Sequence, residues 1–451
     1  MSGIRTAPPE VDRASGGMLD FQRYRSLYER NEADFYDAVE DYGLPFESCE
    51  TQPRDLRCTM QGEWQCRNCS ASLVRGWLSP ACERCRTGEN MESFFISLSC
   101  PKQCWFCFND NQEDADFHRH HRRDVASELR QAYEDGRHLD FIALTGGEPC
   151  LFPDDVASAL REARKRFPES HLRLYTSGAG ADEAIMDEFV QAGLNEVRFS
   201  IKLDDGPEEY ERLLNLMSHC TRHLDTLVEM PVEPHNLDRM KSILTDLEDI
   251  GVRGINLLEL CYPLANAEQY ADRDLRIRRP PYNVVYDYWY AGKFPVAGSE
   301  ADALELLRFA DRKHLSLGVH YCSFDNKNSG QLYLQNSRLS GDIVLQESFP
   351  HHSFDDEDFF IKSVKVFGAG AAELQEAADR EHVRASAATV EVDGRSIELF
   401  EVSCVGAAKL RPYLPEAVFA VSLNVMEPRE GKWAVREVAL REMSEGQGGK
   451  E

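Results

Sequence analysis

The sequence predicts an α/β protein built around a parallel sheet of (β/α)-barrel type. Three observations indicate this fold. Short apolar runs alternate with amphipathic helical segments from residue 94 to residue 320, cysteine pairs crowd residues 58–93, and hairpin patterns replace the alternation after about residue 350. Strand–helix alternation is typical of a parallel sheet covered by helices. Six or seven such units predict an open or closed barrel whose chemistry lies at the carboxyl ends of its strands.

The segments before the barrel have different characters. Residues 1–57 predict a helical extension, in which Phe21, Tyr24, Leu27 and Tyr28 recur at helical spacing and favour an amphipathic helix packed on a later part of the chain. Residues 58–93 are rich in Cys, Arg, Ser and Gly and poor in core-forming side chains. We therefore expect a bound metal to stabilise that segment as a knuckle.

The barrel is predicted over residues 94–330 and a small α+β domain over residues 350–445. In the latter, residues 389–403 contain an Asp-Gly turn and residues 419–440 an EPREGK turn, which favour two β-hairpins. The candidate barrel strands are residues 94–98, 141–145, 172–176, 197–201, 226–230, 255–260 and 315–320.

Composition excludes some classes of protein. The chain has 451 residues, of which 51 are Lys or Arg and 78 are Asp or Glu, and its net charge of -27 disfavours nucleic acid as the main partner. It contains no apolar run of membrane-spanning length and no apolar stretch of the signal-peptide kind at its start. We expect a cytoplasmic protein without a membrane partner. Fourteen cysteines then favour metal sites over disulfides.

One cysteine loop points to an iron–sulfur cluster. The sequence SLSCPKQCWFCFND places Cys100, Cys104 and Cys107 in a C-x3-C-x2-C arrangement directly after the first predicted barrel strand. A [4Fe-4S] cluster usually takes four cysteines, so a loop with three leaves one iron open to another ligand. Zinc with a distant fourth ligand is the alternative that the spacing leaves open.

This loop resembles that of the radical S-adenosylmethionine (SAM) superfamily, and the chain looks like uncharacterised relatives of the enzymes that activate pyruvate formate-lyase and other glycyl-radical enzymes. The resemblance implies that SAM chelates the fourth iron and that Phe106, the aromatic residue before the third cysteine, packs near the adenine. It also implies an electron donor such as flavodoxin or ferredoxin, and reductive cleavage of SAM to a 5′-deoxyadenosyl radical that abstracts hydrogen from a substrate. It covers roughly residues 94–320.

Three further segments match the family at the ends of later strands. The GGE segment follows the second strand, and a TSG segment stands where many members carry TNG. The fourth strand ends in FSIKLDDG, which resembles the S-x-D-G segment of the family but has Lys202 and Leu203 before its acidic pair. The two glycines of the GGE segment let a ligand approach the main chain and leave its N–H and C=O groups open to bind it. The resemblance implies that SAM is bound by Gly146, Gly147, Glu148, Thr176, Ser177, Ser200 and Lys202.

Two other sets of residues are candidates for function. Polar and thiol groups at the ends of later strands predict a substrate pocket with Glu259, Cys261, Tyr321 and Cys322, and no catalytic residue is assigned among them. Upstream, two C-x2-C pairs lie twelve residues apart, which is typical of paired metal knuckles. They predict a zinc or second iron–sulfur site with Cys66, Cys69, Cys82 and Cys85.

The resulting hypothesis is a radical SAM enzyme acting on a peptide, a protein or a small molecule. Two alternatives remain. One is an RNA-modifying radical SAM enzyme that grips RNA with the cysteine knuckle, against which the net charge of -27 weighs. The other is a zinc-ribbon protein that binds or senses a ligand on a catalytically inactive barrel.

Overall fold

The computed structural model describes residues 13–41, 43, 45–48, 57, 61–107, 109–263, 266–288 and 293–443. It forms two compact units. The barrel unit consists of Leu44–Asn283 and Tyr288–Gly330, and the terminal unit consists of Met1–Gly43, Val284–Asp287 and Gln331–Glu451. No helix in the described ranges has the length and apolarity needed to cross a membrane.

The barrel unit is built on a nine-stranded sheet in the order β2-β3-β13-β9-β8-β7-β6-β5-β4. Neighbouring strands from β4 through β9 to β13 are parallel, whereas β3 is antiparallel to both β13 and β2. The strands are β2 (Gln65–Arg67), β3 (Ser72–Arg75), β4 (Met91–Phe95), β5 (Phe141–Thr145), β6 (His171–Thr176), β7 (Glu196–Phe199), β8 (Asp225–Val232), β9 (Gly254–Glu259) and β13 (Gly318–Cys322).

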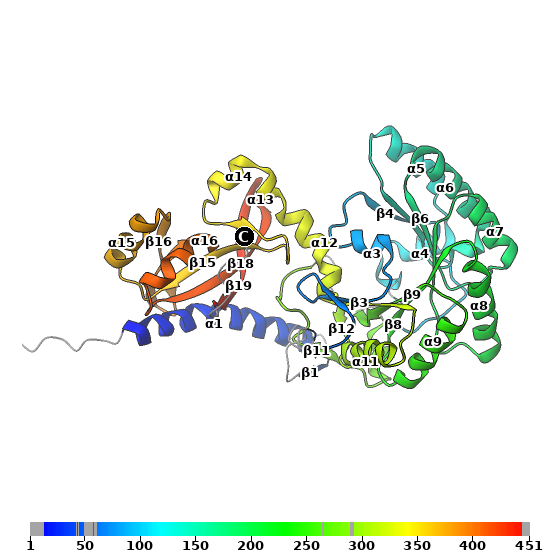
Figure 1. The fold of residues 1–451 in the computed structure, drawn as a ribbon, viewed down its shortest axis with the longest axis horizontal. Helices are drawn as coiled ribbons and strands as arrows, with labels where there is room; N and C mark the ends of the chain where they lie inside the picture. Colours follow the sequence, from blue (N-terminus) through cyan, green and yellow to red (C-terminus); the bar gives the residue numbers. More distant parts are fainter. Residues whose placement is uncertain are drawn as a thin grey trace, which may run out of the picture. The chain divides into compact units, whose positions relative to one another are not determined.

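Helices lie between successive strands and cover the outer side of the sheet, as Figure 1 shows for α5, α6, α7, α8 and α9. The helices are α3 (Pro80–Arg84), α4 (Ala115–His120), α5 (Val125–Glu134), α6 (Pro153–Arg166), α7 (Glu183–Gln191), α8 (Pro207–Cys220), α9 (Leu237–Asp249), α10 (Ala267–Ala271) and α11 (Ser299–Arg312). Short elements complete the unit: η1 (Asn109–Asn111), η2 (Pro149–Leu151), the pair β1 (Phe46–Ser48) and β11 (Ile277–Arg279), and the pair β10 (Cys261–Pro263) and β12 (Lys293–Pro295).

The helix α6 illustrates why these segments fold as they do. Val156, Leu160 and Ala163 recur at helical spacing and are buried in the core against the sheet. Acidic residues occupy the first turn of α6 and basic residues its last turn, so both ends complement the helix dipole. Local sequence and core packing therefore favour the same helix.

The predicted strand–helix alternation is present, with shifts at the two outer strands. Five candidate strands between residues 141 and 260 coincide with β5 to β9 to within a few residues. The first candidate, 94–98, begins three residues later than β4, and the last, 315–320, begins three residues earlier than β13. Apolar residues that flank these strands continue the same pattern, so periodicity alone sets their ends poorly.

The cysteine-rich segment is not separate from the barrel. Its strands β2 and β3 extend the sheet beyond β13, with Val319 opposite Arg75 and Cys322 opposite Ser72. The segment was expected to depend on a bound metal for its stability, but its pairing with β13 joins it to the barrel core, in which Leu73 is fully buried.

The terminal unit combines the first helix of the chain with a six-stranded sheet in the order β16-β17-β15-β18-β19, with β14 beside β15. All its pairings are antiparallel. Its elements are α1 (Arg13–Asp41), α13 (Arg338–Gly341), α14 (Ile343–Ser348), β14 (Ser353–Phe354), β15 (Ile361–Phe367), α15 (Ala371–Glu381), β16 (Ala385–Val392), β17 (Arg395–Val402), α16 (Cys404–Leu410), η3 (Arg411–Tyr413), β18 (Val418–Arg429) and β19 (Lys432–Glu442). The helix α12 (Phe324–Asn336) continues from the barrel unit into this one.

Both predicted hairpins are present in the terminal unit. The strands β16 and β17 meet at Asp393 and Gly394, and β18 and β19 meet at Glu430 and Gly431, all four with the positive φ that tight hairpin turns require. The amphipathic face of α1 packs on this sheet, where Phe21 and Phe367 make an edge contact with ring centroids 5.8 Å apart.

Candidate functional site

The predicted cluster cysteines lie on the loop that follows β4. The N–H of Cys107 donates to the carbonyl of Cys104 at 3.0 Å, which closes a turn between them. Asn266 Nδ2 donates to the carbonyl of Trp105 at 2.5 Å and holds the same turn. The Cys100 thiol interacts electrostatically with the thiols of Cys104 and Cys107. The loop therefore carries all three thiols at the carboxyl end of a barrel strand.

This donor set fits three corners of an iron–sulfur cube. Burial raises the pKa of the Cys100 thiol, and the main-chain N–H of Lys102 opposes that shift by donating to the sulfur. Cys104 and Cys107 are partly exposed. Within the described ranges, no three His, Cys, Asp or Glu side chains are drawn together as a closed metal site, so the role of these thiols as cluster ligands stays a prediction.

The two glycines of the GGE segment pack against the cysteine loop. A Cβ on Gly147 would lie 2.2 Å from the carbonyl oxygen of Ser99, and one on Gly146 would lie 2.3 Å from that of Ser97. The N–H groups of Gly147 and Glu148 donate to those carbonyls, of Ser97 and Ser99 respectively, at 2.8 Å each. We expected these main-chain groups to be open to a ligand. The two N–H groups instead hold the cysteine loop against β5.

Glu148 ties the ends of two strands together. Its side chain is buried, at 1% exposure. Oε1 accepts hydrogen bonds from Thr176 Oγ1 at 2.5 Å and from the N–H of Cys150 at 3.0 Å, and Oε2 accepts one from the N–H of Ser177 at 2.7 Å. The GGE and TSG segments, which the sequence treats as separate motifs, are one hydrogen-bonded unit.

Replacing Glu148 by glutamine should destabilise the barrel unit by about 2–3 kcal/mol, because the amide leaves a donor facing the donors of Thr176 and Ser177. Urea unfolding of the full chain measures the change. Glu208→Gln, an exposed position in the first turn of α8, is the matched control and should change stability by less than about 0.5 kcal/mol. Equal unfolding midpoints for the two variants would show that the Glu148 contacts carry no net stability.

Ser200 and Lys202 lie just beyond β7 rather than within it. Lys202 Nζ donates to Ser200 Oγ at 2.6 Å and lies 5.1 Å from the centroid of the Phe106 ring. A cation over an aromatic face is attracted to it. Three predicted SAM-binding residues therefore form one group: the aromatic residue of the cysteine loop, and a hydroxyl and an ammonium from the end of the fourth barrel strand.

A second lysine joins the same two segments, and sequence reasoning missed it. Lys102, on the cysteine loop, pairs with Asp205 at 2.7 Å and with Glu209 at 3.2 Å. Glu209 is shared between Lys102 and Arg212. The hydrogen bond from Arg212 is the largest cause that lowers the pKa of the Glu209 carboxyl to about 2, and the hydrogen bond from Lys102 acts in the same direction. Asp205, next to the segment that matches the family, thus holds the loop in place.

Glu233 is a further residue that the sequence did not single out. It directly follows β8 and is 4% exposed. Burial, and then the nearby Asp204, raise the pKa of its carboxyl to about 7, against the opposite influence of Lys202 and Arg273. Arg273 stacks on Trp105 of the cysteine loop, 4.6 Å from the ring centroid. The sequence signal that could have identified Glu233 is its place directly after the predicted strand 226–230, where an acidic side chain lies at the carboxyl end of the barrel.

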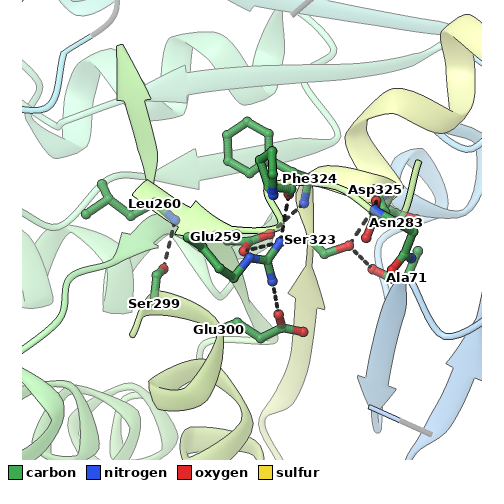
Figure 2. A network of polar contacts seen from close by, with 12 residues as sticks. Ala71, Glu259, Leu260, Asn283, Ser299, Glu300, Ser323, Phe324 and Asp325 are labelled. Atoms are coloured by element: carbon green, nitrogen blue, oxygen red, sulfur yellow. Dashed lines mark hydrogen bonds and ion pairs between the residues drawn. The ribbon is translucent and has the colours of Figure 1, made fainter. Parts of the chain in front are cut away.

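A buried ion-pair network lies at the carboxyl ends of β9 and β13 (Figure 2). Arg57 pairs with Glu300 at 3.0 Å and with Asp325 at 2.9 Å. Arg278 pairs with Glu259 at 3.2 Å and also with Glu300. Burial raises the pKa of the Glu300 carboxyl to about 7, with Arg278 and then Arg57 acting in the opposite direction. Two cations thus serve three carboxylates away from solvent.

The predicted substrate-pocket residues have different surroundings. Glu259 Oε2 accepts a hydrogen bond from the N–H of Phe324 at 2.8 Å, which anchors the first turn of α12. Glu259 therefore belongs to the buried ion-pair network. Tyr321 is fully buried in the core. Cys261 lies on β10, opposite Pro295. Cys322 is the last residue of β13, and burial raises the pKa of its thiol to about 12.

The second set of cysteines is divided between a hairpin and a short helix. Cys66 is on β2, and Cys69 is in the turn before β3, where residues 68–70 all have positive φ. Cys82 and Cys85 belong to α3 and its carboxyl end. Cys82 Sγ accepts a hydrogen bond from Asn256 Nδ2 of β9 at 3.3 Å. The two cysteines of α3 therefore lie on a helix that contacts the sheet, and their role in binding metal stays a prediction.

The comparisons with known proteins match the part of the chain that contains the cysteine loop. The model of the radical SAM superfamily matches residues 95–257, which include Cys100, Cys104 and Cys107, the GGE segment and Lys202. A Methanocaldococcus jannaschii protein named "Putative glycyl-radical enzyme activating enzyme MJ0021" is 23% identical over 298 residues, which cover 64% of this chain and 74% of that protein.

Solved structures with partial similarity include SuiB of Streptococcus suis bound to its precursor peptide, with a TM-score of 0.31 and 13% identity over 37% of this chain and 38% of that chain. Coproporphyrinogen III oxidase from Escherichia coli has a TM-score of 0.34 and 12% identity over 52% of this chain and 56% of that chain. This chain thus covers less than two thirds of each. The family match over residues 95–257 and the activating-enzyme relative carry the assignment: residues 95–257 form a radical SAM domain, and the chain is an enzyme of the radical SAM class.

Proposed function

We propose that this enzyme reductively cleaves SAM at a [4Fe-4S] cluster held by Cys100, Cys104 and Cys107 and abstracts hydrogen from a peptide, protein or small-molecule substrate. The observation that carries this proposal is the position of the three-cysteine loop, directly after β4 and inside the region that matches the superfamily. When bound and reduced, the cluster supplies the electron that splits SAM into methionine and a 5′-deoxyadenosyl radical.

The residues around the loop have complementary tasks in this proposal. Lys202 and Ser200 supply an ammonium and a hydroxyl for polar groups of SAM, and Phe106 supplies a ring for its adenine. Glu148 does not need to touch SAM, because it fixes Thr176 and Ser177 at the edge of the site. Gly146 and Gly147 allow the cysteine loop to lie close to β5, so that all these groups share one end of the barrel.

The substrate class we favour is a protein, namely a partner enzyme that this chain activates. The relative from M. jannaschii is named as an activating enzyme of glycyl-radical enzymes, and the match to it extends over 298 residues. A protein substrate needs a surface for docking, for which the terminal unit, with its sheet of six strands, is a candidate. The electron donor in this proposal is a small redox protein such as flavodoxin or ferredoxin.

We further propose a second metal centre, zinc or an auxiliary iron–sulfur cluster, among Cys66, Cys69, Cys82 and Cys85. Four thiolates suit either occupant, so metal identity must be measured. Iron, zinc and sulfide counts on protein purified without oxygen separate the two: zinc at about one per chain indicates a structural site, and iron well above four per chain indicates a second cluster.

Cleavage of SAM is the direct test. The full chain is purified and reconstituted with iron and sulfide without oxygen, reduced with dithionite and given SAM, and 5′-deoxyadenosine and methionine are quantified by mass spectrometry. Formation of both in equal amounts is expected. A protein whose iron and sulfide content corresponds to a full cluster but which forms no 5′-deoxyadenosine under reducing conditions would contradict the proposal.

A further inference from the structure

The register of the barrel sheet separates two faces. Paired residues on neighbouring strands point to the same side, and successive residues of a strand point to opposite sides. Glu229 pairs with Asn256, and Asn256 pairs with His320. Asn256 Oδ1 and His320 Nδ1 lie 2.9 Å apart, as side chains on one face must. We call this side the inner face; Cys322 lies on it because it is two residues beyond His320.

The helix α3 lies on the inner face. The Ser79 hydroxyl that begins it donates to Glu196 Oε2 at 2.6 Å and accepts from Arg198 Nη2 at 2.9 Å, and both partners are on β7. One turn later, Cys82 reaches Asn256 of β9. The helix therefore extends along the inside of the sheet, and it carries Cys82 and Cys85 there.

Cys322 belongs to the same group of thiols. It interacts electrostatically with Cys82 and Cys85. Its sulfur accepts a hydrogen bond from Asn326 Nδ2 at 3.2 Å, just as Cys82 accepts one from Asn256. Amide donors directed at sulfur stabilise the negative charge of a metal-bound thiolate.

The hairpin turn brings Cys69 to this group but leaves Cys66 away from it. The Asn68 amide bonds Asn326, the residue that also donates to Cys322, so the turn containing Cys69 is fastened beside Cys322. Cys66 pairs with Leu73, which in turn pairs with Tyr321.

Tyr321 precedes Cys322 on β13, so its side chain and that of Cys66 belong to the opposite, outer face. The spacing of the sequence pairs Cys66 with Cys69 as a knuckle, whereas the register separates Cys66 from the thiols of α3.

We propose that the second metal centre is ligated on the inner face of the barrel by Cys69, Cys82, Cys85 and Cys322, and that Cys66 is not a ligand. The inference rests on the second metal of the proposed function and changes its ligand set and its place. Since Cys322 ends a barrel strand, this centre lies on the same rim of the sheet as the loop after β4. Coordination of one metal by all four thiols requires rotation of cysteine side chains, because no three of them are close enough to share a metal in the described ranges.

The experiment counts metal in a background that lacks the first site. In the full chain with Cys100, Cys104 and Cys107 all replaced by alanine, any remaining thiolate-bound metal reports on the second centre alone. We expect about one zinc ion or one cluster per chain in this background. Adding Cys322→Ala should lower that content at least about fivefold, and adding Cys66→Ala should leave it unchanged.

Each outcome has a definite meaning. Loss of metal with Cys66→Ala and its retention with Cys322→Ala would overturn the proposed ligand set in favour of the four cysteines that spacing predicts. A background without metal would overturn the second centre, whatever the unmodified chain does with SAM. Cys220→Ala, a buried cysteine of α8, controls for loss of packing and should keep the metal.

A second measurement does not depend on a folded Cys322 variant. The same metal-loaded background is treated with iodoacetamide, and the labelled cysteines are located by mass spectrometry. Labelling of Cys66 with full retention of metal is expected. Protection of Cys66 that disappears when a chelator removes the metal, or loss of metal on labelling Cys66, would overturn the proposal.

Discussion

Replacing Cys104 by alanine should abolish cleavage of SAM while leaving the barrel folded. In the proposed site, this thiol is one of three that hold the cluster, and a two-thiolate loop cannot keep a four-iron cube in place. Formation of 5′-deoxyadenosine should fall by roughly 100-fold or more, beyond what loss of an outer partner of a metal ligand costs. The fold should survive, because Cys104 contributes its carbonyl, not its sulfur, to the turn with Cys107.

The measurements are the visible absorbance near 400 nm after anaerobic reconstitution and the amount of 5′-deoxyadenosine formed. Cys404→Ala is the matched control, since Cys404 is a partly exposed cysteine in the terminal unit, at the start of α16. It should keep both signals. Unchanged absorbance and product in the Cys104 variant would mean that the cluster, if present, is held by other residues.

Replacing Arg278 by methionine should destabilise the barrel unit by about 3–5 kcal/mol, because it leaves the buried Glu259 carboxylate without its cation and Glu300 with Arg57 alone. Arg278 is 3% exposed and pairs with Glu259 and Glu300, which are equally shielded. Methionine keeps much of the length of the arginine stem, so the lost charge dominates the effect. Urea unfolding measures it.

Two comparisons make the Arg278 result specific. Arg312→Met removes an exposed partner of Glu305, 2.7 Å away, and should cost less than about 1 kcal/mol. The deficit of Arg278→Met should also shrink as the pH falls from about 8 to about 6, because burial raises the pKa of the Glu300 carboxyl to about 7 and its protonation removes buried charge. A cost equal to that of Arg312→Met, or one independent of pH, would show that the network is not held by charge pairing.

Local sequence was sufficient for most elements of the barrel. The candidate strands between residues 141 and 260 coincide with β5 to β9 because alternating burial leaves a periodic trace in neighbouring residues. The two hairpins of the terminal unit were also evident, since Asp393 with Gly394 and Glu430 with Gly431 have the chemistry that tight turns need. The three-cysteine loop identified the family for the same reason, because its spacing is local.

Pairings between distant segments left no such trace. Nothing in residues 65–75 indicates that they pair with β13, some 250 residues later. Likewise, nothing in the sequence of α1 indicates which sheet this helix packs on. The GGE and TSG segments read as independent motifs until Glu148 joined them. Similarly, Glu259 was predicted for a substrate pocket and lies in a buried ion-pair network.

The second cysteine set shows the division most clearly. The sequence determined that Cys66 and Cys69, and Cys82 and Cys85, form two pairs at knuckle spacing. Only the tertiary structure decided which sulfurs share a face, because that depends on the register of β2, β3 and β13. A shift of one residue in that register would exchange the faces of Cys66 and its neighbours without altering the local pattern. Spacing along a chain sets which residues are near in sequence, whereas strand pairing sets which side chains meet.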